Sequence, residues 1–157
     1  MSDNPRARIT SYSAALATFG LASGAALFAA RRAERPTPDR YQPADLVLGT
    51  FATQKFARML AKDPVTTPLR APFTDYEGVA GDAELNESPK SGPEGGHGRH
   101  TLGELLSCPF CLAPWVAGGY VACLAFAPRV ARSWAAVFAL VSVSDALQHV
   151  YARLQAD

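Results

Sequence analysis

Long runs of apolar residues alternate along the chain with segments that are crowded with charges, prolines and glycines. Residues 9–30 and 105–128 carry no charged side chain, and residues 133–151 carry a single formal charge, Asp145. At a rise of about 1.5 Å per residue, each run is long enough to cross a hydrocarbon core of about 30 Å. The three runs therefore predict three membrane-spanning helices.

A signal peptide is the competing interpretation of residues 9–30, because two arginines precede the run and small residues end it. The apolar core of a signal peptide is shorter, about 7–15 residues. The arginine pair at 31–32 also has the character of a stop-transfer flank. A spanning helix is therefore the preferred interpretation.

A fourth helix is predicted over residues 43–60, where apolar side chains form one helical stripe. Lys55 and Arg58 interrupt this stripe, and only nine residues, 46–54, lie between Asp45 and Lys55. That stretch is too short to span a bilayer. The segment is therefore predicted to be an amphipathic helix that lies in the membrane interface.

The distribution of the 15 Lys and Arg residues predicts the orientation in the membrane. With three spans, four of them fall on one side and eleven on the other. The positive-inside rule then places the N-terminus outside and residues 31–100 and the C-terminus in the cytoplasm. If residues 43–60 also crossed, the loops would divide seven to six, with Lys55 and Arg58 left inside the membrane. Three spans are preferred for this reason.

The segments between the helices differ in composition. Residues 63–74 contain three prolines, which forbid a continuous helix and predict an extended strap or a turn-rich loop. Residues 78–100 are rich in Gly, Pro, Ser and acids and predict a mobile loop. Thr101 and Glu104 have the spacing of a capping box, which predicts that a helix starts at Thr101.

The predicted architecture is an all-α integral membrane bundle with three spanning helices, one interfacial helix and a Pro-rich loop. Its segments are an N-terminal span with a basic connector, an interfacial helix with the strap, a mobile loop, and a helical hairpin. They cover residues 1–42, 43–77, 78–100 and 101–157 in turn.

Composition excludes several classes of protein. Charged residues make up 18% of the chain, against about 25% in ordinary soluble proteins, and no basic patch predicts nucleic-acid binding. Three cysteines do not form the even set of a disulfide scaffold. The expected partners are the lipid bilayer and either a second copy or another membrane protein. Gly20 and Gly24 could offer a close-approach face for such a partner, and the alternative is that the pair only reflects the Ala- and Gly-rich composition of the span.

Two motifs resemble a known bacterial family, the domain of unknown function 1360, which includes small membrane proteins named for sporulation. One motif is RMLAKD at 58–63 running into VTTPLRAPFT at 65–74, and the other is ELLSCPFC at 104–111 followed by Trp115. The resemblance covers residues 45–152 and implies a membrane location, with no catalytic residue to carry over. The sporulation label is not transferred, because this Ala- and Arg-rich composition is unlike that of spore-forming Firmicutes.

The Cys108-Pro109-Phe110-Cys111 element has the CxxC form of the glutaredoxin dithiol. In that dithiol the first thiolate is stabilised by the start of a helix. Pro109 either kinks one continuous helix or begins a new helix with Cys108 as its cap. The second geometry favours a reactive Cys108, and the first favours a structural or ligand role.

A metal site is a further hypothesis. Asp145 and His149 share one face of the last span, and a helical hairpin would bring His149 to the depth of Cys111. Together with Cys108 they would suit zinc or another thiophilic metal. Alternatively the two polar residues reach interfacial water and the cysteines are ordinary packing. Cys123 is predicted to be packing, and His97 and His100 are not expected to be ligands.

Arg70 is presented between two prolines of the strap. It could clamp Glu104 or Asp145, or bind an anionic lipid head group. The alternative is a solvated loop arginine. Structural or interaction roles are predicted for Arg70, Thr101, Glu104, Pro109 and Trp115.

The chain contains no complete nucleophile, nucleotide or cofactor motif. The predicted function is a non-enzymatic scaffold or accessory subunit in the bacterial inner membrane. The alternative is a thiol-redox or metal-handling membrane protein that uses the CPFC element with Asp145 and His149.

Overall fold

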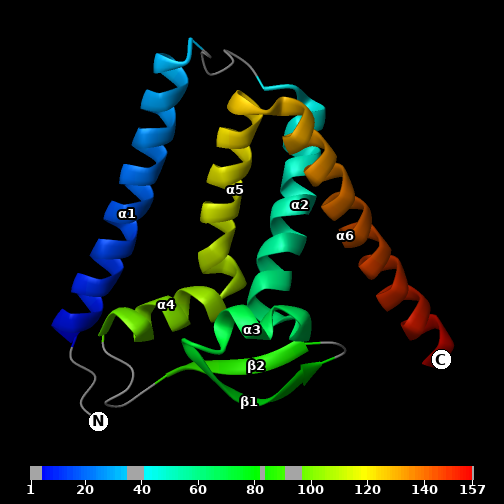
Figure 1. The fold of residues 1–157 in the computed structure, drawn as a ribbon. Coiled ribbons are helices and arrows are strands. Elements are labelled where there is room, and N and C mark those ends of the chain that lie inside the picture. Colours follow the sequence, from blue (N-terminus) through cyan, green and yellow to red (C-terminus); the bar gives the residue numbers. More distant parts are fainter. Residues whose placement is uncertain (1–4, 35–40, 82–83, 91–96, 157) are drawn as a thin grey trace.

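The computed structural model describes residues 5–34, 41–81, 84–90 and 97–156. Its four long helices alternate in direction and form the upright part of the molecule (Figure 1): α1 (Pro5–Arg32), α2 (Pro43–Lys62), α5 (Pro109–Phe126) and α6 (Pro128–Ala156). The short elements gather at one end, here named the capped end: η1 (Pro64–Thr66), α3 (Thr67–Arg70), β1 (Thr74–Gly81), β2 (Glu84–Pro89) and α4 (His97–Ser107).

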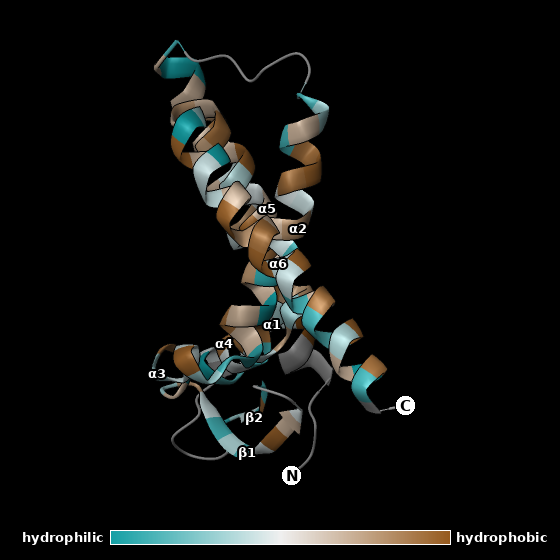
Figure 2. Ribbon diagram, turned by 90° about the vertical axis from the view of Figure 1, so that its right-hand side faces the viewer, coloured by the Kyte–Doolittle hydropathy of each residue, from teal (hydrophilic) through white to brown (hydrophobic). Residues whose placement is uncertain are grey.

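Three of the long helices have the length and apolar composition needed to cross a membrane, as the sequence predicted. The qualifying stretches are Tyr12–Arg32, Pro109–Phe126 and Pro128–Gln155. Only 6% of the first and 17% of each of the others is buried inside the protein. Hydrophobic residues recur along the length of these helices (Figure 2), and such exposed apolar surface is typical of a membrane protein.

α2, the helix predicted to lie in the membrane interface, packs against two of the apolar helices. It runs alongside α5 and α6 in the middle of the group (Figure 1). Its place relative to a membrane stays a prediction. Its packed face consists of small residues, among them Gly49, Ala52, Ala57 and Ala61, all of which are buried. Small side chains let neighbouring helices approach closely.

The charges that argued against a packed α2 are paired. Asp45 accepts two hydrogen bonds from Arg132 of α6, at 2.8 and 2.9 Å. Lys55 lies 2.7 Å from Asp145 of α6. A sequence pattern shows the charges of one helix but not their partners on another, and this is why it predicted an isolated surface helix.

The core of the helix group is aromatic and lies between α2, α5 and α6. Trp134 and Phe138 of α6 pack edge to face against Phe56 of α2, with ring centroids 5.3 and 4.9 Å apart. Tyr120 of α5 donates a hydrogen bond to the main-chain carbonyl of Asp45 at 3.0 Å. Its ring lies so close to the backbone of α2 that a Cβ atom on Gly49 would collide with it.

α1 is attached through a few specific contacts. Phe19 meets Trp115 of α5 edge to face at 5.2 Å, and Tyr12 donates a hydrogen bond to Glu104 of α4 at 2.9 Å. Beyond these contacts most of the apolar residues of α1 are exposed, including Leu16 and Leu21 at 72% and 76%. α1 therefore presents a large apolar surface to its surroundings.

The hairpin of β1 and β2 corrects the all-α prediction. It lies in the segment predicted as a mobile loop, of which residues 78–81 and 84–89 form strands. Residues 82–83 and 91–96 of that predicted loop lie outside the described residues. The two strands are antiparallel, and their register pairs Thr74 with Pro89 and Tyr76 with Glu87. Gly78 adopts φ +146°, a conformation that favours glycine, at an irregularity in this pairing. Polar composition suggested a loop because the hairpin is held by main-chain pairing and one buried acid rather than by apolar burial.

The second predicted span is divided in two. α4 ends at Ser107 and lies across the capped end, and α5 begins at Pro109 (Figure 1). α4 already starts at His97, so Thr101 lies inside the helix and the predicted capping box is wrong. The carboxylate of Glu104 instead bonds Tyr12 and lies 3.7 Å from His100.

The alternation of the four helices also bears on the termini. The beginning of α1 and the end of α6 both lie at the capped end (Figure 1). Of these helices, α1, α5 and α6 contain the stretches that are long and apolar enough to span a membrane. The outside N-terminus and cytoplasmic C-terminus stay a prediction.

Candidate functional site

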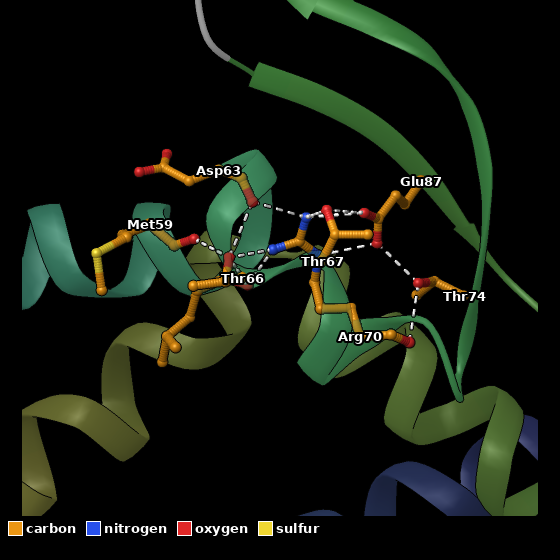
Figure 3. Close-up of polar contacts among 8 residues, drawn as sticks. Met59, Asp63, Thr66, Thr67, Arg70, Thr74 and Glu87 are labelled. Carbon is orange, nitrogen blue, oxygen red and sulfur yellow. Dashed lines mark hydrogen bonds and ion pairs between the residues drawn. The ribbon is translucent and has the colours of Figure 1, made fainter.

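Arg70 is at the centre of a buried polar network at the capped end (Figure 3). It is the largest side chain that the described residues bury completely. Nε and Nη2 each donate a hydrogen bond to the carboxylate of Glu87 at 2.8 Å. Nη1 donates to the carbonyl of Leu60 at 2.7 Å, and Nη2 also to that of Asp63 at 3.1 Å. The guanidinium thus joins the end of α2 to strand β2.

Three threonines complete this network. Thr66 accepts from Arg70 Nη1 and donates to the carbonyl of Met59 at 2.6 Å. Thr74 donates to Glu87 at 2.7 Å, and Thr67 donates to the same carboxylate at 3.3 Å. A buried charge is tolerated only when it is paired and hydrogen-bonded, and both requirements are met here.

The network lowers the pKa of Glu87 below its usual value of 4.5. The hydrogen bonds from Arg70 are the largest cause, because they favour the ionised carboxylate more than burial disfavours it. Glu87 therefore stays charged at neutral pH.

The prolines of the strap place Arg70 locally. Pro64 stands in the first turn of η1 and Pro68 in the first turn of α3, positions where the missing N–H costs nothing. The strap is therefore the turn-rich loop and not the extended one. Arg70 contacts neither of its predicted protein partners, Glu104 and Asp145, and its complete burial excludes both a lipid contact and a solvated side chain.

The CPFC element forms the start of α5. Cys108 is the N-cap of this helix, and its Sγ accepts a hydrogen bond from the main-chain N–H of Cys111 at 3.2 Å. Pro109 is the first helical residue, so it begins a new helix and does not kink a continuous one. Cys108 is half-buried and Cys111 is exposed.

The predicted metal site is not assembled. Within the described parts of the chain, no three His, Cys, Asp or Glu side chains gather closely enough to hold a metal ion. Asp145 is engaged by Lys55, and His149 is exposed on α6. Cys108 and Cys111 thus lie near each other without the two other proposed ligands.

Asp145 and His149 instead line a polar groove between α2 and α6, with a volume of about 780 Å³. Lys55, Asp63 and Arg58 also line the groove, as does Glu84 of β2. Lys55 lies between two acids, 2.7 Å from Asp145 and 3.9 Å from Asp63, and Arg58 forms an ion pair with Glu84. Burial raises the pKa of Asp63 above its usual value.

Several of these residues could not be identified from the sequence. Glu87 lies 17 residues from Arg70 in a segment of loop-like composition, so nothing in its neighbourhood indicates a buried acid. The pair of Lys55 and Asp145 joins helices that are far apart in the chain. Only the recurrence of threonine and proline around Arg70 could have indicated the network, because these residues form local hydrogen-bonded turns.

Comparison with known proteins agrees with the resemblance of the two motifs. The family model described as protein of unknown function (DUF1360) matches residues 48–151. The curated protein named sporulation protein YjcA, from Bacillus subtilis strain 168, is 31% identical over 103 residues, which cover 66% of this chain and 86% of that protein. No solved structure matches. The matched region contains the strap, the hairpin, the CPFC element and most of both helices of the polar groove. The chain belongs to the DUF1360 family.

Proposed function

We propose that this protein is a non-enzymatic scaffold or accessory subunit of a bacterial membrane, with all four long helices embedded in the bilayer. The observation that carries the proposal is the exposure of α1, of whose apolar stretch only 6% is buried. A helix of this length and composition needs an apolar environment, which lipid or another membrane protein supplies.

The inclusion of α2 among the embedded helices rests on its packing. Ionisable residues within a membrane are tolerated when they face the interior of a bundle and pair with one another. Asp45 and Lys55 meet this condition through Arg132 and Asp145 of α6. The 20 residues of α2 would rise about 30 Å, the thickness of a hydrocarbon core.

A scaffold role fits the way in which the polar groups are used. The fully buried Arg70 donates hydrogen bonds to other groups of the protein, and Lys55 and Arg58 are also paired within it. Meanwhile Leu16, Leu21 and other apolar residues of α1 face outward. These side chains are available to a second copy or to another membrane protein.

Site-specific photo-cross-linking from α1 tests this proposal. A photoreactive amino acid at Leu16 or Leu21 is expected to give a discrete cross-linked protein band in intact membranes. The same amino acid at Leu124, which is buried in the core of this protein, is the control and should give none. Cross-linking to lipid alone from both α1 positions, together with a monomer on gentle solubilisation, would contradict a scaffold.

A thiol-redox function is the second candidate, and the capping geometry of Cys108 favours it. A cysteine at a helix start has its thiolate stabilised by the N-terminal N–H groups. A redox titration and elemental analysis of the purified protein, beside a Cys108→Ser/Cys111→Ser variant, test it. A titratable dithiol or a bound metal is expected only in the parent protein, and the absence of both would rule this candidate out.

A further inference from the structure

The polar groove lies between α2 and α6, beside the part of α6 that diverges from α2 (Figure 1). Ala131, Ala135 and Ala139 are buried and hold the first half of α6 against its neighbours. Every residue of α6 from 146 to 155 is exposed, and in Figure 1 this part of the helix diverges from α2. The groove of about 780 Å³ therefore lies between two helices that separate, and it opens to the surroundings.

The charged side chains of the groove are concentrated toward the capped end. Phe51 lies beside Thr50 and Gln54 in the lining, and Asp63 is 12 residues later, about 18 Å along the chain direction of α2. Lys55, Arg58 and Asp63 follow one another toward the capped end, and Glu84 also lines the groove. On the outer side of α6, Leu147 and Val150 are exposed at 63% and 55%. A polar interior thus adjoins an apolar outer surface at the same depth.

We propose that this groove binds the head group of a zwitterionic phospholipid that carries a primary ammonium, of the phosphatidylethanolamine class. The inference rests on the proposed function, in which α2 and α6 are embedded in the bilayer. The phosphate lies against Arg58, the ammonium against Asp145 and Asp63, and the acyl chains follow the outer face of α6.

Charge complementarity selects this class of head group. The groove holds two cationic side chains, Lys55 and Arg58, and three carboxylates, so a purely anionic head group meets more repulsion than attraction. A primary ammonium offers three N–H donors to the carboxylates, as a lysine does. A quaternary ammonium offers none, so a choline head group satisfies the acids less well.

The existing ion pairs leave room for this ligand. Arg58 bonds Glu84 through Nε and Nη2 while its side chain remains 49% exposed, so its guanidinium is accessible to a phosphate. The side chain of Asp145 is 38% exposed although it is paired with Lys55. A carboxylate accepts several hydrogen bonds, so Asp145 can bond Lys55 and an ammonium together.

Native mass spectrometry of the full chain, released from nanodiscs of defined lipids, tests the proposal. The lipids are phosphatidylethanolamine, phosphatidylcholine and phosphatidylglycerol with identical acyl chains. We expect phosphatidylethanolamine to be retained about tenfold over phosphatidylcholine, the ratio that one or two charge-assisted hydrogen bonds give. Phosphatidylglycerol should be retained less than phosphatidylethanolamine.

Two variants and two matched controls locate the binding. Ala152→Trp fills the groove from an exposed position without changing its charge, and Asp145→Asn removes one acid; both should abolish the preference. Ala22→Trp on the exposed face of α1 and Arg153→Gln on α6 lie outside the groove lining and should retain it.

Equal retention of the three lipids, or a preference that survives Ala152→Trp, overturns the proposal. Binding of free phosphoethanolamine with no preference among the lipids also overturns it, because the ligand would then be a soluble compound. Carbonate extraction of cell membranes distinguishes these failures from failure of the proposed function. A protein that resists extraction but shows no lipid preference is membrane-embedded without this site.

Discussion

Arg70 illustrates how the burial of a charge depends on its partners. Removal of its guanidinium would leave Glu87 as a buried carboxylate whose main hydrogen-bond donors are lost. An uncompensated buried charge is strongly destabilising, whereas replacement of both partners by apolar residues is often tolerated. The two cases give opposite expectations for single and double substitutions in the network.

Arg70→Met is therefore expected to lower the free energy of unfolding by about 3–5 kcal/mol. Arg70→Met combined with Glu87→Leu should recover a substantial part of that loss, because no charge then remains unpaired. Arg129→Met, at an exposed position on α6, is the control and should change little. Denaturation of the purified protein in detergent measures all three, and a double variant no better than the single one would contradict the pairing.

The lowered pKa of Glu87 predicts that the stability of the hairpin depends on pH. Its pKa is lower in the folded protein than the usual 4.5, so its contribution to stability is fully present above that pH. The contribution is lost as the pH falls from 4.5 through the lowered folded pKa, when the carboxylate becomes protonated. Hydrogen exchange should show the amides of β1 and β2 losing protection over this acidic range.

Glu87→Gln is the matched control for that experiment, since it keeps the shape of the side chain but does not titrate. Its hairpin should be less protected at neutral pH and should show little of the acid transition. The same transition in the parent protein and in Glu87→Gln would assign it to another group.

At the scale of whole elements, the sequence predicted the uniformly apolar helices correctly. It did not predict the packing of α2 or the strands of the hairpin. Residues 9–30 and 133–151 fall inside α1 and α6 because uninterrupted apolar composition alone identifies such helices. The packing of α2 against α6 was not predicted, because its charges were considered without Arg132 and Asp145, which neutralise two of them. The hairpin was missed because main-chain pairing leaves little trace in composition.

The candidate sites divide into local features, which the sequence could indicate, and contacts between distant segments, which it could not. The cap formed by Cys108 and Pro109 was one of two alternatives, since proline at a first helical position has a local cause. The partner of Arg70 could not be identified from the sequence, because the contact with Glu87 depends on how the hairpin folds back onto α2. Local chemistry was therefore predictable, and contacts between distant segments were not.

The packing of α2 against α5 predicts a strong effect at Gly49. Gly49→Leu would drive a side chain into the ring of Tyr120, and overpacking of this kind costs about 1–3 kcal/mol. Gly20→Leu on α1, where nothing lies within 4 Å of the added Cβ, is the matched control. Thermal unfolding in detergent should show a lower midpoint for the first variant only; equal midpoints would mean that α2 and α5 do not pack in this way.

At the scale of the whole molecule, the direction of the four helices predicts the membrane topology. If α2 crosses the bilayer with α1, α5 and α6, the N- and C-termini lie on the same side. The loop charges, divided seven to six, give little preference for which side that is.

Reporter fusions at the two termini test this directly. A reporter that is active only in the cytoplasm and one that is active only outside it should give the same assignment for the N- and C-terminal fusions. Opposite assignments would restore the three-span arrangement and place α2 in the interface.

The contacts that Arg70 and Thr66 make with Leu60, Met59 and Asp63 also determine how α2 can end. The last carbonyls of a helix lack partners within the helix and ordinarily turn to water. Here the guanidinium bonds the carbonyl of Leu60 and that of the C-cap residue Asp63, a hydroxyl bonds that of Met59, and the cation stands at the negative end of the helix dipole. Protein groups thus take the place of water at these carbonyls. Because the same guanidinium also bonds Glu87, the end of α2 and the hairpin are joined as one unit.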